Sequence, residues 1–395
     1  MSKKVIADVF LEVANAIESG EFGKKVKIGV TTLGSEHGVE NMVNGAQLAK
    51  SNLFDIVLIG PKVETDLEVV EVNDEKEMHA KMEELLDSGY IDACVTMHYN
   101  FPIGVSTVGR VITPAKGKEM ILATTTGTSA TNRIEAMVRN AIYGIATAKS
   151  MGNKCPKVGI LNVDGARQVE KCLKELKDNG YDMEFADSIR ADGGCVMRGN
   201  DLLVGAPDVM VTDTLSGNIF MKVFSSYTTG GDYEAQGFGY GPGVGEDYDR
   251  KVLIVSRASG SPVVANALKY AYDVVKGDIS NVARNEFAKV KKAKFDDIIS
   301  SLTKKEVKAE KVEVKMPDKE IVTRQIAGVD IMDLEDAVSE LWKNGIYAES
   351  GMGCTGPIVL VNEAKGDLAV ETLVKAGYLS LIHISEPTRQ AEISY

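Results

Sequence analysis

The segment AESGMGCTGP, residues 348–357, places a thiol, Cys354, among glycines and before the apolar run IVLV. A thiolate is a strong nucleophile, so this cysteine could accept an acyl group as a thioester. Gly353 and Gly356 would let backbone N–H groups turn toward a developing oxyanion. The alternative is that Cys354 is a small packing residue, because most free cysteines are buried and unreactive. The segment alone permits both roles.

A second segment, ATTTGTSATNR at residues 123–133, gathers hydroxyls directly before a long helical pattern. Helix N-termini present unpaired N–H groups and bind anions, so we expect a phosphate cradle here. Its candidate residues are Thr126, Gly127, Thr128, Ser129 and Asn132. The segment lacks the Walker lysine and the GxGxxG spacing, which argues against ATP and dinucleotides. Hydroxyls also cap helices that bind no ligand, and that alternative stays open.

A third segment, TDTLSGNIFMK at residues 212–222, carries Asn218 and Lys222 four positions apart. On a helix they would share one face and could jointly hold a carbonyl or phosphate oxygen. A capped helix with an exposed lysine explains the same pattern. The glycine-rich stretch at residues 237–245 is either a moving lid or a surface loop.

The elements that must position these residues are short apolar runs alternating with helical patterns from Lys24 to Gly277. This alternation predicts an α/β fold with a doubly wound, mostly parallel sheet of the Rossmann-like type. In such sheets ligands bind beyond the carboxyl ends of the strands. The loops at residues 31–38, 123–133 and 212–222 each follow an expected strand, so we expect the site among them.

The chain divides into five expected parts, which we define by composition and periodicity. They are an N-terminal helix at 1–23, the core at 24–277, a charged helical or linker segment at 278–330, a C-terminal α/β unit with Cys354 at 331–379, and a tail at 380–395. The tail, SLIHISEPTRQAEISY, breaks the preceding helix pattern and is similar to a translated sequencing adaptor. We expect it to add nothing to the core.

Composition narrows the class of protein. The 45 basic and 57 acidic residues give a net charge of -12, which disfavours nucleic acid as a partner. The N-terminus has no apolar run of signal-peptide length, so we expect a cytoplasmic protein that does not contact a membrane. The five cysteines form no CxxC pair and lie apart from the histidines, so neither a metal site nor a disulfide framework is indicated. Cys94, Cys155, Cys172 and Cys195 are expected in the core.

Four segments together resemble the α subunit of component C of the glycine, sarcosine and betaine reductase complexes. They are residues 123–152, 212–222, 239–246 and 351–367. The resemblance extends over everything before Ser380. More distantly, residues 27–276 resemble the phosphate acyltransferases of phospholipid synthesis, in which the segments matching 123–132 and 216–222 border the active cleft.

The resemblance implies an acetyl-transfer subunit in anaerobic amino-acid fermentation. Cys354 would accept a two-carbon unit from a selenoprotein, component A, as a thioester, and inorganic phosphate would release acetyl phosphate. The implied partners are the β subunit of component C and component A, in a hetero-oligomer without a cofactor in this chain. Two other functions remain open, a Rossmann-like module that binds a small ligand and a non-catalytic scaffold subunit.

Overall fold

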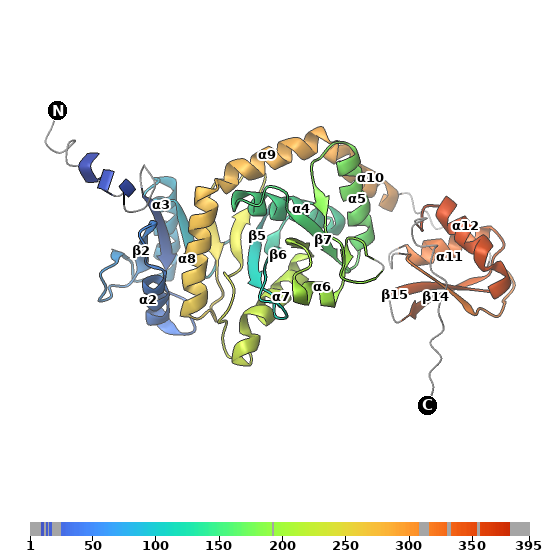
Figure 1. Ribbon diagram of the computed structural model, residues 1–395, viewed down its shortest axis with the longest axis horizontal. Coiled ribbons are helices and arrows are strands. Elements are labelled where there is room, and N and C mark those ends of the chain that lie inside the picture. The colour runs from blue at the N-terminus through green and yellow to red at the C-terminus, as the bar shows by residue number, and fades with distance from the viewer. Residues whose placement is uncertain are drawn as a thin grey trace. The chain divides into compact units, whose positions relative to one another are not determined.

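The computed structural model describes residues 9–11, 13–14, 16–17, 25–191, 193–307, 316–329, 333–353 and 356–379 (Figure 1). The side chains of 302–307 and of residues 352, 353 and 356 lie outside that description. The chain forms two compact units. The large unit comprises residues 1–163 and 169–299, and the small unit comprises residues 164–168 and 300–395.

The large unit is built on one mixed sheet with two parallel halves. The first half has the order β3-β2-β1-β4-β12, with strands β3 (Glu68–Glu71), β2 (Phe54–Gly60), β1 (Val26–Thr31), β4 (Ala93–Thr96) and β12 (Val252–Ile254). The second half has the order β6-β10-β7-β8, with strands β6 (Glu119–Thr128), β10 (Val209–Val211), β7 (Lys157–Leu161) and β8 (Glu184–Phe185), and β9 (Val196–Met197) also pairs with β7. The expected α/β fold with a mostly parallel sheet is confirmed.

Two central strands, β11 (Gly241–Val244) and β5 (Val105–Ile112), join the halves. The pairs β12–β11, β11–β5 and β5–β6 are all antiparallel. Because three reversals separate β12 from β6, the two parallel halves run in opposite directions. Strands β1, β4 and β12 therefore end at one edge of the sheet, which we call the first edge. Strands β6, β10 and β7 end at the opposite, second edge.

The glycine-rich stretch is neither a lid nor a surface loop, because its residues 241–244 form β11, which is buried throughout. Glycine is required there for packing. A Cβ on Gly241, whose φ is +84°, would lie 1.7 Å from the carbonyl oxygen of Val108. Because glycine has no side chain, this strand fits between its neighbours at the centre of the sheet.

Helices cover the sheet (Figure 1). They are α2 (Gly38–Ala49), α3 (Glu75–Asp87), α4 (Arg133–Ser150), α5 (Ala166–Asp178), α6 (Gly199–Val204), α7 (Thr214–Ser226), α8 (Ser261–Lys276) and α9 (Ile279–Lys292), with a 3₁₀ turn η1 (Tyr227–Thr229) after α7. Helix α10 (Phe295–Val307) follows α9 in sequence and continues into the small unit. Helix α2 packs against α8, and α4 packs against α9. Helix α4 is buried along most of its length. Small and apolar residues occur on most of its sides, and a helix with that pattern is expected to be buried.

Residues 279–299 belong to the segment at 278–330 that we expected to be helical or a linker, and they form α9 and the first part of α10. Helix α9 buries Ile279, Ala283, Phe287 and Val290, while its lysines point outward. This spacing is that of an amphipathic helix on the surface of a core. The high charge of the segment hid this apolar stripe.

A buried ion cluster fixes α9 to the unit. Glu286 is 2% exposed, and its carboxylate accepts hydrogen bonds from Lys149 Nζ at 2.9 Å, Tyr181 OH at 2.8 Å and Lys289 Nζ at 2.6 Å. Burial alone would raise the pKa of Glu286, but the bonds from Lys289, Lys149 and Tyr181 outweigh it and hold the pKa below the ordinary 4.5. The ionised carboxylate is therefore the stabilising form.

We expect Glu286→Gln to destabilise the large unit by about 1–3 kcal/mol at neutral pH. A lowered folded-state pKa gives stability that is fully present above pH 4.5 and is lost as the pH falls through the folded value. The difference between wild type and variant should therefore shrink in acid. Urea unfolding followed by circular dichroism at neutral and acid pH measures it. An equal difference at both pH values would contradict this assignment.

The small unit is a three-stranded antiparallel sheet with the order β13-β15-β14. Its elements are β13 (Arg324–Ala327), α11 (Leu334–Lys343), β14 (Ala348–Gly353), β15 (Gly356–Val361), the turn η2 (Glu363–Lys365) and α12 (Gly366–Lys375). Both helices pack on the sheet through a core that includes Leu341, Val359 and Leu373. Helix α12 begins at Gly366, and Asp367 in its first turn pairs with Arg324 at 2.7 Å.

Strands β14 and β15 form a hairpin in which Gly353 pairs with Gly356. The two residues between them in sequence, Cys354 and Thr355, lie outside the described residues, as does the tail at 380–395. The glycines that flank the predicted nucleophile are therefore paired strand residues.

Candidate functional site

Two of the predicted segments meet at the second edge. Strands β6 and β10 are parallel neighbours, so the loop after β6 and the start of α7 emerge side by side. Asn218 Nδ2 donates a hydrogen bond to the carbonyl oxygen of Thr125 at 3.0 Å. Arg133 Nη2 lies 3.3 Å from Asp213 Oδ2, the carboxylate that caps α7. The fold thus joins residues that lie about 90 positions apart.

Gly217 explains how closely α7 approaches β6. A Cβ at this position would lie 1.8 Å from the carbonyl oxygen of Thr124 and 3.1 Å from Thr212 Cγ2. Helix and strand therefore pack backbone against backbone. Gly217 therefore allows the close contact between α7 and β6. This role was not predicted, because the sequence pattern indicated only Asn218 and Lys222 as functional residues.

The polar side chains of the predicted phosphate cradle divide into two groups. Ser129 is buried, with Oγ 2.7 Å from Ser106 Oγ and 2.5 Å from Asn140 Oδ1, and Asn132 caps α4 through Oδ1. These two side chains bond within the protein. Thr126 is half-buried and Thr128 is exposed, and neither hydroxyl has a hydrogen bond within the described residues. Those two remain able to contact a ligand.

Gly127 lies between the two threonines, with φ at +91°. A Cβ there would lie 2.5 Å from the carbonyl oxygen of Val105. The glycine therefore holds the end of β6 against the start of β5, whatever else this segment binds.

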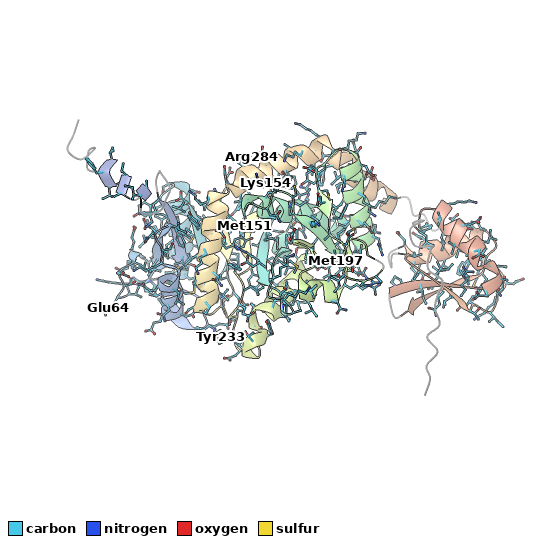
Figure 2. All side chains as sticks on the ribbon, viewed as in Figure 1. Glu64, Met151, Lys154, Met197, Tyr233 and Arg284 are labelled. Carbon is cyan, nitrogen blue, oxygen red and sulfur yellow. The ribbon has the colours of Figure 1, made fainter. Side chains whose placement is uncertain are left out.

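Lys222 turns toward the first edge. Its Nζ donates to Glu234 Oε1 at 3.1 Å and to Ser256 Oγ at 2.9 Å, and Ser256 follows β12. Asn218 and Lys222 share a helix, but Asn218 contacts Thr125 in β6, whereas Lys222 contacts Glu234 and Ser256, which lie outside the strands. Helix α7 runs back along the sheet from the end of β10, so each turn moves it away from the second edge. Tyr233, labelled in Figure 2, precedes Glu234 in the segment after α7.

Glu234 is the centre of a buried polar group at this edge. It is 2% exposed, and it also accepts bonds from Ser259 Oγ at 2.9 Å and Tyr240 OH at 3.2 Å. Burial, and then the charge of Glu234, raise the pKa of Tyr240, so its hydroxyl stays protonated and donates to the carboxylate. A buried carboxylate held by two hydroxyls therefore fixes the Lys222 ammonium.

Glu234, Ser256 and Ser259 were not among the residues predicted from the sequence. The sequence around them gives a partial indication of a site. Residues 251–257 match the pattern of a strand, and the helix that follows them has a proline in its first turn. The loop after β1 joins the same region, because His37 Nε2 lies 3.3 Å from the carbonyl oxygen of Ala258 and Asn41 Nδ2 donates to that of Ser259. The loop at residues 31–38 thus lies at the opposite edge from the other two predicted segments.

The described cysteines differ in burial. Cys94, Cys172 and Cys195 are buried, and burial raises the pKa of all three, to about 11 for Cys172 and about 12 for Cys195. These side chains remain neutral thiols at pH 7. The expected core position of Cys155 is wrong, because it is exposed just before β7.

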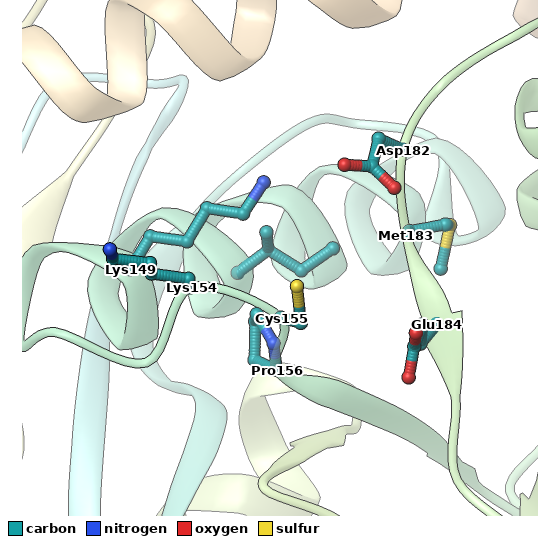
Figure 3. Close-up of a pocket in the computed structure, with 8 residues that line it drawn as sticks. Lys149, Lys154, Cys155, Pro156, Asp182, Met183 and Glu184 are labelled. Atoms are coloured by element: carbon teal, nitrogen blue, oxygen red, sulfur yellow. The ribbon is translucent and has the colours of Figure 1, made fainter.

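Cys155 borders a small hollow (Figure 3). The lining residues are Ile145, Lys149, Lys154, Cys155, Pro156, Asp182, Met183 and Glu184. Lys149 is bound to Glu286, so this hollow belongs to the ion cluster that fixes α9. Within the described parts of the chain, no group of three or more possible ligands could hold a metal ion. None of the described helices is long and apolar enough to span a membrane.

Comparisons place the chain among known proteins. The model of the family described as "Fatty acid synthesis protein" matches residues 26–360. The chain is 66% identical over 381 residues to the glycine/sarcosine/betaine reductase complex component C subunit alpha of Peptoclostridium acidaminophilum, covering 96% of this chain and 99% of that protein. It is 29% identical over 234 residues to the phosphate acyltransferase of Thermotoga neapolitana, covering 50% of this chain and 68% of that protein.

Among solved structures, a branched-chain phosphotransacylase from Enterococcus faecalis is similar, with a TM-score of 0.46 and 17% identity. That match covers 63% of this chain and 99% of the other. A 4-hydroxythreonine-4-phosphate dehydrogenase from Klebsiella pneumoniae matches with a TM-score of 0.41 and 12% identity, covering 64% of this chain and 100% of the other.

Proposed function

The chain belongs to the fatty acid synthesis protein family, with a component C subunit alpha as a close relative, and from this we propose that it is an acyltransferase subunit of a glycine, sarcosine or betaine reductase complex. The observation that carries the proposal is the 66% identity over 96% of the chain, which extends through both units. The distant phosphate acyltransferases support acyl transfer to or from phosphate.

In the proposed reaction Cys354 holds an acetyl group as a thioester, which it receives from a selenoprotein partner. An oxygen of inorganic phosphate attacks the thioester carbonyl, the C–S bond breaks, and acetyl phosphate and the Cys354 thiolate result. Phosphate is the only small co-substrate, and this step requires no cofactor. The proposed assembly is a hetero-oligomer with the β subunit of component C and the selenoprotein component A.

Phosphate binding is assigned to α7, with Asn218 and Lys222 as the first candidates and residues 126–129 as the next. Lys222 supports this assignment because its side chain is 53% exposed although its ammonium is held by buried Glu234. A lysine has three N–H donors, and Glu234 and Ser256 take two of them. One donor remains for an oxygen of phosphate.

We expect Lys222→Ala to raise the phosphate concentration needed for acetyl release by roughly ten- to a hundredfold, because a charge-assisted contact is lost. Acetylation of the thiol by the natural donor should be little changed. Lys174→Ala is a matched control, since Lys174 is also about half exposed and pairs with a glutamate on its own helix. An unchanged phosphate requirement in Lys222→Ala would move the site to residues 126–129.

The test of the function is release of acetyl phosphate from the labelled, isolated chain when phosphate is added. Release by this chain alone supports the acyltransferase. If release requires the companion subunit, the chemistry belongs there and this chain is a scaffold.

A further inference from the structure

Tyr240 lies in the middle of a hydrogen-bonded path that joins the two polar residues predicted on α7. Its hydroxyl donates to Glu234 Oε1 at 3.2 Å, and the same oxygen accepts from Lys222 Nζ at 3.1 Å. Its carbonyl oxygen accepts from Thr125 Oγ1 at 2.8 Å, and the carbonyl oxygen of Thr125 accepts from Asn218 Nδ2 at 3.0 Å. The path therefore leaves α7 at Lys222 and returns to it at Asn218. We call its three inner members, Glu234, Tyr240 and Thr125, the Tyr240 bridge.

The Tyr240 bridge is buried, whereas the lysine that it holds is not. All three members of the bridge lie in the interior, and Tyr240 packs in the main hydrophobic core of the large unit. Lys222 is about half exposed and carries its ammonium on a flexible stem. An exposed lysine normally samples many rotamers, and ordering it costs entropy. Contacts with closely packed interior groups restrict Lys222 before any ligand arrives.

The glycine-rich stretch at residues 237–245 determines where Tyr240 lies. Both of its neighbours are glycines with positive φ, +75° at Gly239 and +84° at Gly241. A Cβ on Gly239 would lie 3.0 Å from the carbonyl oxygen of Ile254, the same oxygen that accepts from the backbone N–H of Tyr240 at 2.8 Å. The two glycines therefore let the chain pass close to β12 while the tyrosine side chain turns inward to Glu234.

We propose that Tyr240 is a positioning residue for phosphate. Through Glu234 it fixes the Lys222 ammonium in the orientation that leaves one N–H for a phosphate oxygen. The inference rests on the proposed function, because it takes Lys222 as a phosphate ligand. It also gives the glycine-rich stretch a role, which is to bring Tyr240 to the carboxylate.

The division of contacts on Glu234 supports this role. Tyr240 and Lys222 bind the same oxygen, Oε1, while Ser259 Oγ donates to Oε2 at 2.9 Å. The tyrosine hydroxyl therefore fixes the very atom that holds the ammonium. A buried carboxylate needs such partners, because burying a charge without them is costly. Without the tyrosine hydroxyl, Ser259 alone would orient the carboxylate from inside the unit, and Lys222 would lose a fixed partner.

The first test is the phosphate dependence of acetyl release in Tyr240→Phe, which removes only the hydroxyl. The KM for phosphate should rise roughly fivefold or more, and the rate at saturating phosphate should stay within about twofold of wild type. Tyr181→Phe is the matched control, because Tyr181 is also buried and donates to a buried carboxylate, Glu286, that pairs with a lysine. It should leave the KM unchanged. An equal KM in wild type and Tyr240→Phe would overturn the proposal.

A double variant tests whether Tyr240 acts through Lys222. In the Lys222→Ala background, Tyr240→Phe should change the KM for phosphate by less than about twofold, because the group that it positions is gone. A general loss of packing would instead raise the KM by the same factor in both backgrounds. That additive result would overturn the proposal.

Labelling of Lys222 by an amine-reactive succinimidyl ester, measured on its peptide by mass spectrometry, tests the bridge without any turnover. The labelling rate should rise roughly threefold or more in Tyr240→Phe and stay unchanged in Tyr181→Phe, because the amine is less firmly held. Equal rates in wild type and Tyr240→Phe would overturn the proposal. If the rate rises but Lys222→Ala needs no more phosphate than wild type, the bridge is upheld and the phosphate assignment of the proposed function fails. Unchanged circular dichroism shows that the variants fold.

Discussion

Gly217→Ala should unfold the large unit at a clearly lower urea concentration than wild type, with a loss on the order of 3 kcal/mol. The added Cβ would lie 1.8 Å from the carbonyl oxygen of Thr124, a backbone atom of a central strand that cannot rotate away. Helix α7 must shift outward, which also breaks the bond from Asn218 to Thr125. The intrinsic preference of helices for alanine over glycine, about 1 kcal/mol, is too small to compensate.

The chain offers a control variant and two separate probes. Gly199→Ala is the control, because Gly199 lies in the first turn of α6, as Gly217 does in α7, but a Cβ there has no atom within 4 Å. Trp342 is the only tryptophan and lies in the small unit, so its fluorescence follows that unit alone. Circular dichroism follows mainly the large unit. Gly217→Ala should shift the dichroism transition and leave the Trp342 transition in place. A variant as stable as wild type would show that α7 can move freely.

Cys354→Ala should lose all acetyl label that survives gel filtration under denaturing conditions. The expectation rests on the sequence around Cys354 and on the similarity to the component C subunit alpha. Among the described cysteines, Cys155 is the exposed one, so it is the competing acceptor. Cys155→Ala should keep the label, and Cys195→Ala should keep it too because its thiol is buried and neutral.

Neutral hydroxylamine identifies the bond, because it cleaves a thioester and leaves acetylated lysine intact. Label that remains in Cys354→Ala, or that resists hydroxylamine in wild type, would exclude Cys354 as the acceptor. A loss of label in Cys155→Ala alone would assign the thioester to the hollow beside Lys149. Circular dichroism of each variant checks the fold.

The sequence predicted the alternating elements because buried parallel strands and amphipathic helices leave plain periodic patterns. It did not predict the direction of the second half of the sheet. The reversal depends on β5, which was missed because VSTVGRVI is interrupted by Gly109 and Arg110. That glycine is a packing requirement, since a Cβ there would lie 2.4 Å from Met221 Cε. An apolar run carries no information on strand direction.

The candidate site was predicted in part. The loop after β6 and the start of α7 do meet, as adjacent carboxyl ends of parallel strands should. The partner of Lys222 could not be predicted, because Glu234 lies 12 residues further on and is buried only through tertiary packing. Spacing within a helix predicts which side chains share a face. It does not predict which other element will neutralise their charge.

The position of β11 and β12 has a consequence for how the chain folds. These strands lie between β4 and β5 at the centre of the sheet, yet they follow them by more than a hundred residues. During synthesis each half can begin to pair its own strands, but the two cannot join until residue 254 has emerged. Closing such a long loop is slow, and unpaired edges of β4 and β5 stay exposed meanwhile. We therefore expect refolding to have a slow last phase, with aggregation most severe before β11 and β12 insert.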